Sequence, residues 1–295
     1  MAENIERIFE YNGMPVAYRV TGNGPPLLIL HGWGSSSRVM MPLGQALGDI
    51  RTCYIPDLPG FGATPPPKKP WAVDDYVELT RSFAGRVIGG PTDILAHSFG
   101  GRITLKWAAR EGMKKTVPDG EALQDIRNSN RSNEDGCEQE DISELLQKII
   151  ITGGAGMRPK RSYGYYRRRS LAMLLKAPFA FLPSALKNKA MTRLRATDLW
   201  KSLGSTDYRK LDGIMREIFV KTVSEHLEHC LPVIPHEVLL LWGKEDKATP
   251  WYQGERMEKG LENGALVGIE RAGHYAFLDQ PDRFQRIVRA FLTAQ

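Results

Sequence analysis

The chain contains very little cysteine: Cys53, Cys137 and Cys230 are the only three in 295 residues. Their number is odd and their spacings are wide, which excludes a disulfide framework and a cysteine-based metal site. We therefore expect core or loop thiols. Long apolar runs are also missing, because no stretch approaches the roughly 20 residues of a membrane span. The first twenty residues lack the basic start and apolar middle of a secretion signal, so we expect a cytoplasmic protein without a membrane partner.

The excess of positive charge is confined to one part of the chain. The net charge is +6 and the composition, 42% hydrophobic and 25% charged, is that of a soluble globular protein. Residues 158–221 contain sixteen Lys or Arg against four Asp or Glu, whereas residues 116–147 contain nine acidic residues against two arginines. Neighbouring segments of opposite charge could offset one another. We therefore expect a small-molecule substrate as the partner rather than a nucleic acid.

Short apolar segments alternate with helical patterns along most of the chain. This alternation predicts an α/β fold, with a parallel sheet covered by helices on both faces. Two early strands before the alternation begins predict an antiparallel start to the sheet. The predicted strands are 16–20, 27–31, 51–55, 93–96, 149–152, 238–242 and 264–269, and the predicted helices are 43–47, 73–87, 98–111 and 281–292.

Two segments interrupt this alternation. Residues 116–147 are polar and acidic and connect a helix to a strand, where a handful of residues is usual, so we expect an insertion that is at least partly disordered. Residues 158–231 are basic and helical in composition and contain no obvious strand. We interpret them as a helical cap inserted into a core domain formed by residues 1–157 and 232–295.

A serine stands where a buried strand turns into a helix. The sequence Ala96-His97-Ser98-Phe99-Gly100 follows a short apolar strand and precedes a helical pattern. This is the context of a nucleophile elbow, in which small neighbours allow a sharp turn that exposes the serine Oγ. The usual pattern is G-x-S-x-G, and the alanine at position 96 adds one methyl group to it. An ordinary helix N-cap is the alternative interpretation of Ser98.

The earlier buried strand 27–31 leads into a glycine-rich turn. It reads His31-Gly32-Trp33-Gly34, and such a loop can bring a backbone N–H beside the serine. The backbone N–H groups of Trp33 and Phe99 are therefore the candidate oxyanion hole.

Two further strands end in residues that could complete a catalytic triad. Asp246 follows the strand 238–242, and His274 follows the strand 264–269. The carboxyl ends of parallel strands share one edge of a sheet, so Ser98, Asp246 and His274 can meet there. Glu245 is the alternative acid, and Asp57 is expected to be structural. His31 and His97 flank the site, and we expect them to serve in hydrogen bonding or packing.

As a set, these motifs resemble the α/β-hydrolase superfamily, in particular its serine esterases and meta-cleavage product hydrolases. The motifs HGWG, DLPGFG, AHSFGG, WGKED and AGHYAFLDQPDRF occur in the order of that superfamily. The resemblance implies a mostly parallel eight-stranded sheet with an inserted cap. It also implies Ser98 as nucleophile, His274 as base and Asp246 as the acid that orients the base. It implies no cofactor and no metal, and the HLEH sequence at 226–229 lacks the pattern of a metal site.

The expected function is hydrolysis of a small or medium carboxylic ester through an acyl-enzyme. Alternatives are carbon–carbon bond hydrolysis of the meta-cleavage type, perhydrolysis, and a non-catalytic ligand-binding receptor on the same fold. Haloalkane dehalogenases and epoxide hydrolases use Asp where Ser98 stands, which counts against both. Large apolar residues of the cap could bind an acyl chain, although packing of the cap is the alternative interpretation. The candidates are Leu171, Leu175, Phe179 and Phe181.

Overall fold

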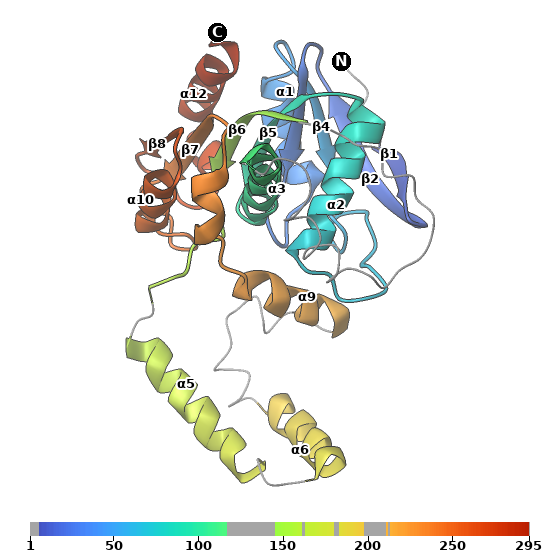
Figure 1. The fold of residues 1–295 in the computed structure, drawn as a ribbon, viewed down its shortest axis with the longest axis vertical. Coiled ribbons are helices and arrows are strands. Elements are labelled where there is room, and N and C mark those ends of the chain that lie inside the picture. Colours follow the sequence, from blue (N-terminus) through green and yellow to red (C-terminus); the bar gives the residue numbers. More distant parts are fainter. Residues whose placement is uncertain are drawn as a thin grey trace.

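The computed structural model describes residues 6–116, 145–160, 163–179, 183–197, 211 and 213–294. Eight strands form one sheet in the order β1-β2-β4-β3-β5-β6-β7-β8 (Figure 1). The strands are β1 (Glu6–Tyr11), β2 (Met14–Thr21), β3 (Pro26–Leu30), β4 (Thr52–Pro56), β5 (Thr92–His97), β6 (Leu146–Thr152), β7 (Val238–Gly243) and β8 (Gly264–Ile269).

Most of the sheet is parallel, as predicted. All neighbouring strands pair in parallel in the part of the sheet with the order β4-β3-β5-β6-β7-β8. The pairs β1–β2 and β2–β4 are antiparallel. The predicted antiparallel start exists, but it consists of β1 and β2, and the predicted early strand at 27–31 belongs to the parallel part. The pattern in β1 was too weak to predict a strand, because only Phe9 of its six residues is buried at this sheet edge.

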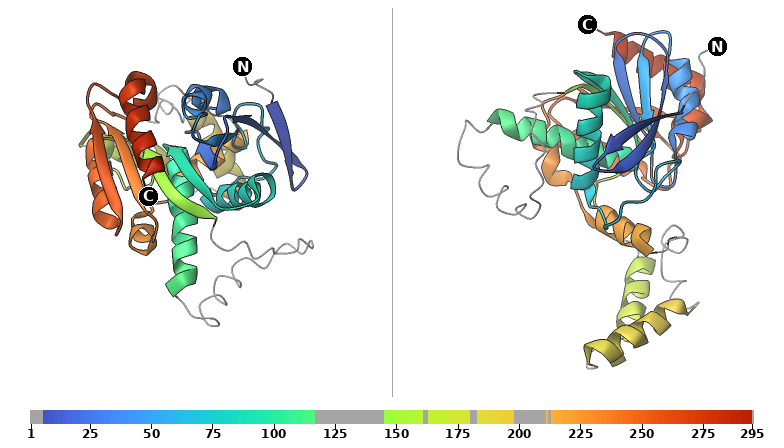
Figure 2. Two further views of the ribbon diagram at one scale, coloured as in Figure 1. Left: turned by 90° about the horizontal axis from the view of Figure 1, so that it is seen from above. Right: turned by 90° about the vertical axis from the view of Figure 1, so that its right-hand side faces the viewer.

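The central strands are apolar on both faces because helices cover both faces. Alternate residues point to opposite sides: Leu28 and Leu30 belong to one buried cluster, and Leu27 and Ile29 belong to the other. Figure 2 shows the two helical layers. The helices of the body are α1 (Ser37–Ala46), α2 (Val73–Phe83), α3 (Phe99–Thr116), α10 (Trp251–Gly260), α11 (Ala276–Asp279) and α12 (Pro281–Thr293), with the π-helical turn η1 (Ala84–Ile88) after α2.

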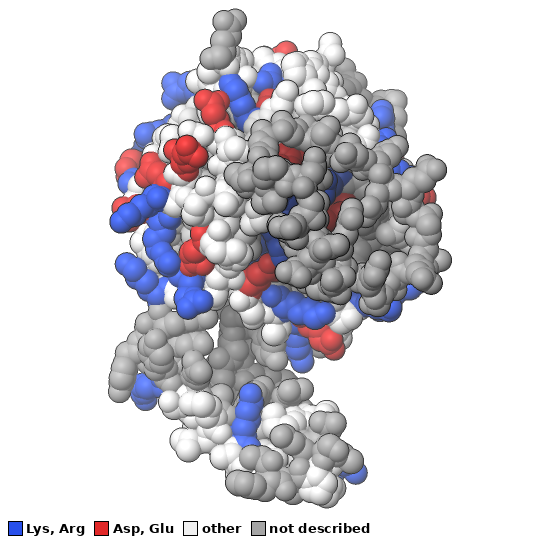
Figure 3. Space-filling model, viewed as in Figure 1, with Lys and Arg blue, Asp and Glu red and all other residues white. Residues whose placement is uncertain are grey.

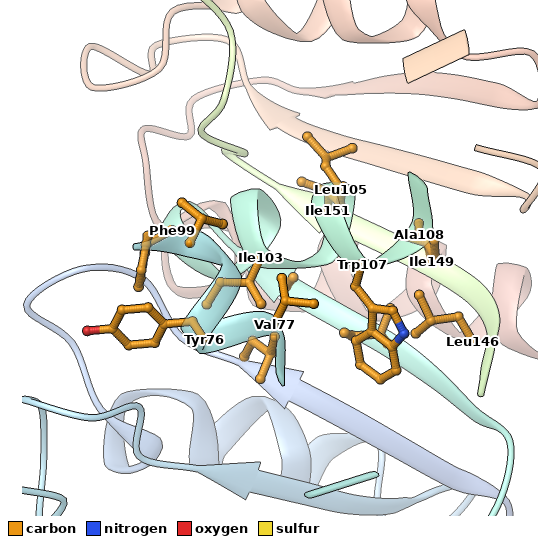
Figure 4. Packing of buried hydrophobic residues seen from close by; sticks show 14 of the residues in the cluster. Tyr76, Val77, Phe99, Ile103, Leu105, Trp107, Ala108, Leu146, Ile149 and Ile151 are labelled. Carbon is orange, nitrogen blue, oxygen red and sulfur yellow. The ribbon is translucent and has the colours of Figure 1, made fainter. Parts of the chain in front are cut away.

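The helix α3 fixes the direction in which the chain leaves β5. Its residues Ile103 and Trp107 are fully buried and pack with Val77 of α2 and Ile149 of β6 (Figure 4). Burial of such a side chain stabilises the fold by about 1.5–3 kcal/mol. The helix that follows Ser98 is therefore held firmly against the sheet.

The segment predicted as a cap divides into two parts. The helices α5 (Tyr163–Lys176) and α6 (Ser184–Ala196) stand apart from the sheet and its helices (Figures 1 and 2), and both contact the short η2 (Ala177–Phe179). The helix α9 (Gly213–Ser224) instead packs on the body, where Ile218 joins the same buried cluster as Leu28. The turn η3 (Glu228–Val233) then leads into β7.

The surface mixes charges of both signs. In the view of Figure 3, acidic and basic side chains alternate over the described part of the body. Most of the predicted acidic insertion, residues 117–144, lies outside the described residues, as does Cys137. Cys53 and Cys230 are buried free thiols, and burial raises their pKa to about 12 and about 11. No described helix combines the length and the apolar character that crossing a bilayer would require.

Candidate active site

Ser98 occupies a strained turn between β5 and α3. Its φ is +52°, in the left-handed region that residues other than glycine seldom adopt. The turn is held from both sides, because the Ser98 N–H donates to the carbonyl of Thr152 at 3.0 Å and its carbonyl accepts from the Ala155 N–H at 3.0 Å. A Cβ on Gly100 would lie only 2.7 Å from Leu30 Cβ. The glycine two residues after Ser98 is therefore a packing requirement of the turn.

Asp246 and His274 are joined by a hydrogen bond. His274 Nδ1 lies 2.8 Å from Asp246 Oδ2, and the Asp246 side chain is fully buried. Burial by itself raises the pKa of Asp246, but its hydrogen bonds with His274 and Thr249 and the charge of His274 lower it below its ordinary value. An ionised carboxylate accepts from Nδ1–H, which leaves Nε2 of His274 as a proton acceptor. Glu245, the alternative acid, is exposed and has no such bond to His274.

The ends of four neighbouring strands come together at this edge of the sheet. Ser98 follows β5, Gly153 follows β6, Asp246 follows β7 and His274 follows β8. A Cβ on Gly153 would lie 3.0 Å from His274 Nδ1 and 3.2 Å from Asp246 Oδ2. Gly153 also has a φ of +54°. Asp246 and His274 therefore pack directly over the backbone of Gly153, the residue after β6.

His97 connects the turn at Ser98 to the loop after β8 that contains His274. Its Nε2 lies 3.0 Å from the backbone carbonyl of His274, and the centroids of the two imidazole rings are 4.7 Å apart. Burial, followed by the charge of His274, lowers the pKa of His97 to about 3, so its ring is neutral and Nε2–H is the donor. The residue before Ser98 thereby holds the backbone of the proposed base, in agreement with the hydrogen-bonding role expected from the sequence.

The glycine-rich loop after β3 is organised by His31. Its Nδ1–H donates to the Gly32 carbonyl at 2.7 Å, and its Nε2 accepts from the Leu58 N–H at 2.9 Å. Burial lowers the pKa of His31, which keeps the ring neutral. The C=O and N–H of a trans peptide point in opposite directions. Because His31 binds the Gly32 carbonyl, the Trp33 N–H of the same peptide points away from His31. The rings of Trp33 and Phe99, the two candidate oxyanion residues, lie 5.4 Å apart.

Asp57 ties two loops together, as expected from the sequence. One carboxylate oxygen accepts from the Ser37 N–H at 2.5 Å and the other from the Ala63 N–H at 2.9 Å. Both acceptor atoms are thus committed to backbone donors at the start of α1 and in the turn after β4. These contacts give Asp57 a structural role.

The structure does not bring the predicted acyl-binding residues of α5 to Ser98. Leu171 is exposed, Leu175 and Phe179 are half-buried, and their helix and η2 stand apart from the body (Figure 1). Phe181 lies outside the described residues. The assignment of these four residues to the substrate site stays a prediction.

The helix α9 instead lies beside Trp33, in the loop that is the candidate oxyanion loop. The ring of Phe219 packs edge-on against Trp33 with 5.1 Å between centroids. Lys106, on the helix that follows Ser98, forms an ion pair with Glu225 at the end of α9, and Arg102 donates to the Glu225 carbonyl. This position could not be predicted from the sequence, because the apolar residues of α9 do not by themselves indicate which part of the body they contact.

Thr249 and Gly153 are the other residues of the site that the sequence analysis missed. Their only sequence signals are small: Thr249 follows Asp246 by three residues, and Gly153 begins a Gly-Gly pair after a strand. Within the described ranges, no cluster of His, Cys, Asp or Glu could hold a metal ion.

The arrangement of the sheet and of these strand ends defines a class of protein, the α/β hydrolases. The sequence model of the alpha/beta hydrolase family matches residues 27–287. The chain therefore belongs to that family and is a hydrolase.

Relatives of known activity cover nearly the whole chain. The pimeloyl-[acyl-carrier protein] methyl ester esterase of Nitrosomonas europaea is 25% identical over 279 residues, which cover 90% of this chain and 94% of the relative. The 2-hydroxy-6-oxo-2,4-heptadienoate hydrolase of Pseudomonas putida is 23% identical over 305 residues, 99% of this chain and 97% of the relative. The solved structure of a meta-cleavage product hydrolase from Pseudomonas fluorescens has a TM-score of 0.64 at 20% identity, covers 98% of both chains, and so shows the same fold.

Proposed function

We propose that this hydrolase is a serine esterase that cleaves a small or medium carboxylic ester through an acyl-enzyme. The observation that carries the proposal is the hydrogen bond between His274 and Asp246, which follow β8 and β7 at the same edge of the sheet as the Ser98 turn. A buried carboxylate bonded to Nδ1–H fixes the tautomer in which Nε2 accepts a proton. Ser98 supplies the hydroxyl in this proposal, because it follows β5 at the same edge of the sheet.

The reaction has two halves. Ser98 Oγ attacks the ester carbonyl while His274 Nε2 takes its proton, and the same proton then passes to the departing alkoxide. A water molecule next gives a proton to His274 and attacks the acyl-enzyme, which releases the carboxylic acid and restores Ser98. Asp246 stabilises the imidazolium in both halves. The Trp33 and Phe99 N–H groups stabilise the oxyanion, each by about 3 kcal/mol.

The side chains around the oxyanion loop support an apolar acyl group. Trp33 packs against Phe61, Phe99 and Phe219, with 4.9–5.4 Å between ring centroids. Aromatic walls favour binding of hydrocarbon over binding of a charged group. The esterase activity of the Nitrosomonas europaea relative points in the same direction.

Carbon–carbon bond hydrolysis is the second candidate, because the Pseudomonas putida relative hydrolyses a 2-hydroxy-6-oxo-dienoate. That reaction starts from a substrate with a carboxylate, whereas the esterase substrate needs none. The two functions therefore differ in the charge that the site must accept.

The test is turnover of para-nitrophenyl esters from acetyl to lauroyl, alongside 2-hydroxy-6-oxo-2,4-heptadienoate, by the wild type and by Ser98→Ala. We expect ester turnover that depends on Ser98 and exceeds dienoate turnover. Faster cleavage of the dienoate would favour the second candidate. Ester turnover that survives in Ser98→Ala would contradict the serine mechanism, and absence of turnover on every substrate would favour a ligand-binding receptor.

A further inference from the structure

Thr249 lies between Asp246, His274 and the backbone of Gly153, the residue after β6. It is buried in the loop between β7 and α10, three residues after Asp246. Its Oγ1 lies 2.8 Å from Asp246 Oδ2, 3.0 Å from the Gly153 carbonyl and 3.4 Å from His274 Nδ1. No other described hydroxyl group has a hydrogen bond to either Asp246 or His274.

The single hydroxyl proton of Thr249 has two acceptors within reach. Hydrogen bonds to an ionised acceptor are about twice as strong as those to a neutral one. The lowered pKa of Asp246 keeps its carboxylate ionised. The Thr249 hydroxyl therefore donates its hydrogen bond to Asp246 Oδ2 in preference to the Gly153 carbonyl. The distance of 2.8 Å to Oδ2, shorter than the 3.0 Å to the carbonyl, agrees with this assignment.

With this bond, both oxygens of the buried carboxylate are fully used. Oδ1 accepts from the backbone N–H groups of Ala248 and Thr249 at 2.8 and 2.9 Å, and Oδ2 accepts from Thr249 Oγ1 and His274 Nδ1. Four donors in fixed positions leave the carboxylate a single orientation. Without the hydroxyl, Oδ2 would keep only the bond that it makes to the base.

We infer that Thr249 is a positioning residue, which donates to Asp246 Oδ2 and thereby fixes the plane of the carboxylate that orients His274. This inference rests on the proposed function, because it assigns Thr249 a part in the same acid–base pair. It distinguishes Thr249 from a residue that merely packs, since the loss of its hydroxyl should change the reaction more than the fold.

Two matched pairs of variants isolate the hydroxyl group. The first pair is the wild type and Thr249→Val, which keeps the shape of the side chain without the hydroxyl. The second pair is Thr249→Ser, which keeps the hydroxyl, and Thr249→Ala, which lacks it. All variants retain the backbone N–H that donates to Asp246 Oδ1. The measurements are kcat and KM for the best ester, the pH profile of kcat/KM, and thermal unfolding.

In Thr249→Val and Thr249→Ala we expect kcat to fall by about ten- to a hundredfold, with little change in KM. This fall in kcat is the rate equivalent of one lost hydrogen bond to a charged group. The part of the acid limb at which Asp246 takes up a proton should move to higher pH, because the Asp246 carboxylate loses a hydrogen bond that lowers its pKa. Thr249→Ser should restore most of kcat and the wild-type profile.

Suppose that Ser98→Ala inactivates the protein but that Thr249→Val and Thr249→Ala both keep the wild-type kcat and pH profile. This result would overturn the inference about Thr249 and leave the proposed function intact. Activity that survives in Ser98→Ala would instead overturn the proposed function. If Thr249→Val does not fold, the comparison of the Ser and Ala variants decides by the same measurements.

Discussion

The substitution Gly153→Ala should impair catalysis out of proportion to its effect on stability. Gly153 has a φ of +54°, where an alanine costs about 1–2 kcal/mol of conformational strain. The new methyl group would also lie 3.0 Å from His274 Nδ1 and 3.2 Å from Asp246 Oδ2, so these atoms must shift by a few tenths of an ångström. Their 2.8 Å hydrogen bond would then be distorted. We expect kcat/KM to fall by about tenfold or more, since small misplacements of catalytic groups are costly.

Gly89→Ala is the matched control. Gly89 also has a positive φ, +80°, but a Cβ at this position would meet no atom within 4 Å. Urea unfolding should give a loss of about 1–2 kcal/mol for both variants, and ester hydrolysis should be impaired only in Gly153→Ala. Equal activity in the two variants would refute the reasoning, because it would mean that the methyl group does not disturb the acid–base pair.

Three further predictions follow from other contacts. Asp246→Asn should lower kcat by about four orders of magnitude, as expected when the base loses its tautomer; steady-state kinetics that leave kcat within tenfold would count against Asp246. Phe219→Ala should shift the ester preference to longer acyl chains, by about fourfold in kcat/KM per methylene that gains an apolar contact, and an unchanged chain-length profile would argue against a role of α9 beside Trp33. The wild type should lose stability as the pH falls below 6.5, because burial lowers the pKa of His97 to about 3 and only the unfolded chain then binds a proton there. Urea unfolding at pH 7 and pH 5 should show a smaller loss in His97→Gln, and an equal loss in both proteins would exclude His97 as its source.

Apolar runs predicted most of the parallel part of the sheet well because most of its strands are buried on both faces. The segments PLLIL and VLLLWG are apolar runs, and both form interior strands of the sheet. The edge strand β1 escaped prediction for the opposite reason, since ERIFEY buries only Phe9. Turns rich in glycine marked the ends of the strands, and those ends carry Ser98, Asp246 and His274.

Contacts between distant segments could not be predicted in the same way. The hydroxyl of Thr249 and the bare backbone of Gly153 matter only because β6 and β7 are neighbours in the sheet. The helix α9 has two basic residues, whereas α5 and α6 have four each, but this difference does not reveal its contact with Trp33. The cytoplasmic location, the boundaries of the cap and the substrate role of Leu171 stay predictions.

The most direct test of the central claim is to identify the residue that a fluorophosphonate modifies in the folded protein. Intact-mass spectrometry and peptide mapping should find a single adduct on Ser98, formed much more slowly in His274→Ala and absent from Ser98→Ala. An adduct on any other residue, or ester turnover by a protein whose Ser98 stays unmodified, would contradict the assignment of Ser98 as the nucleophile.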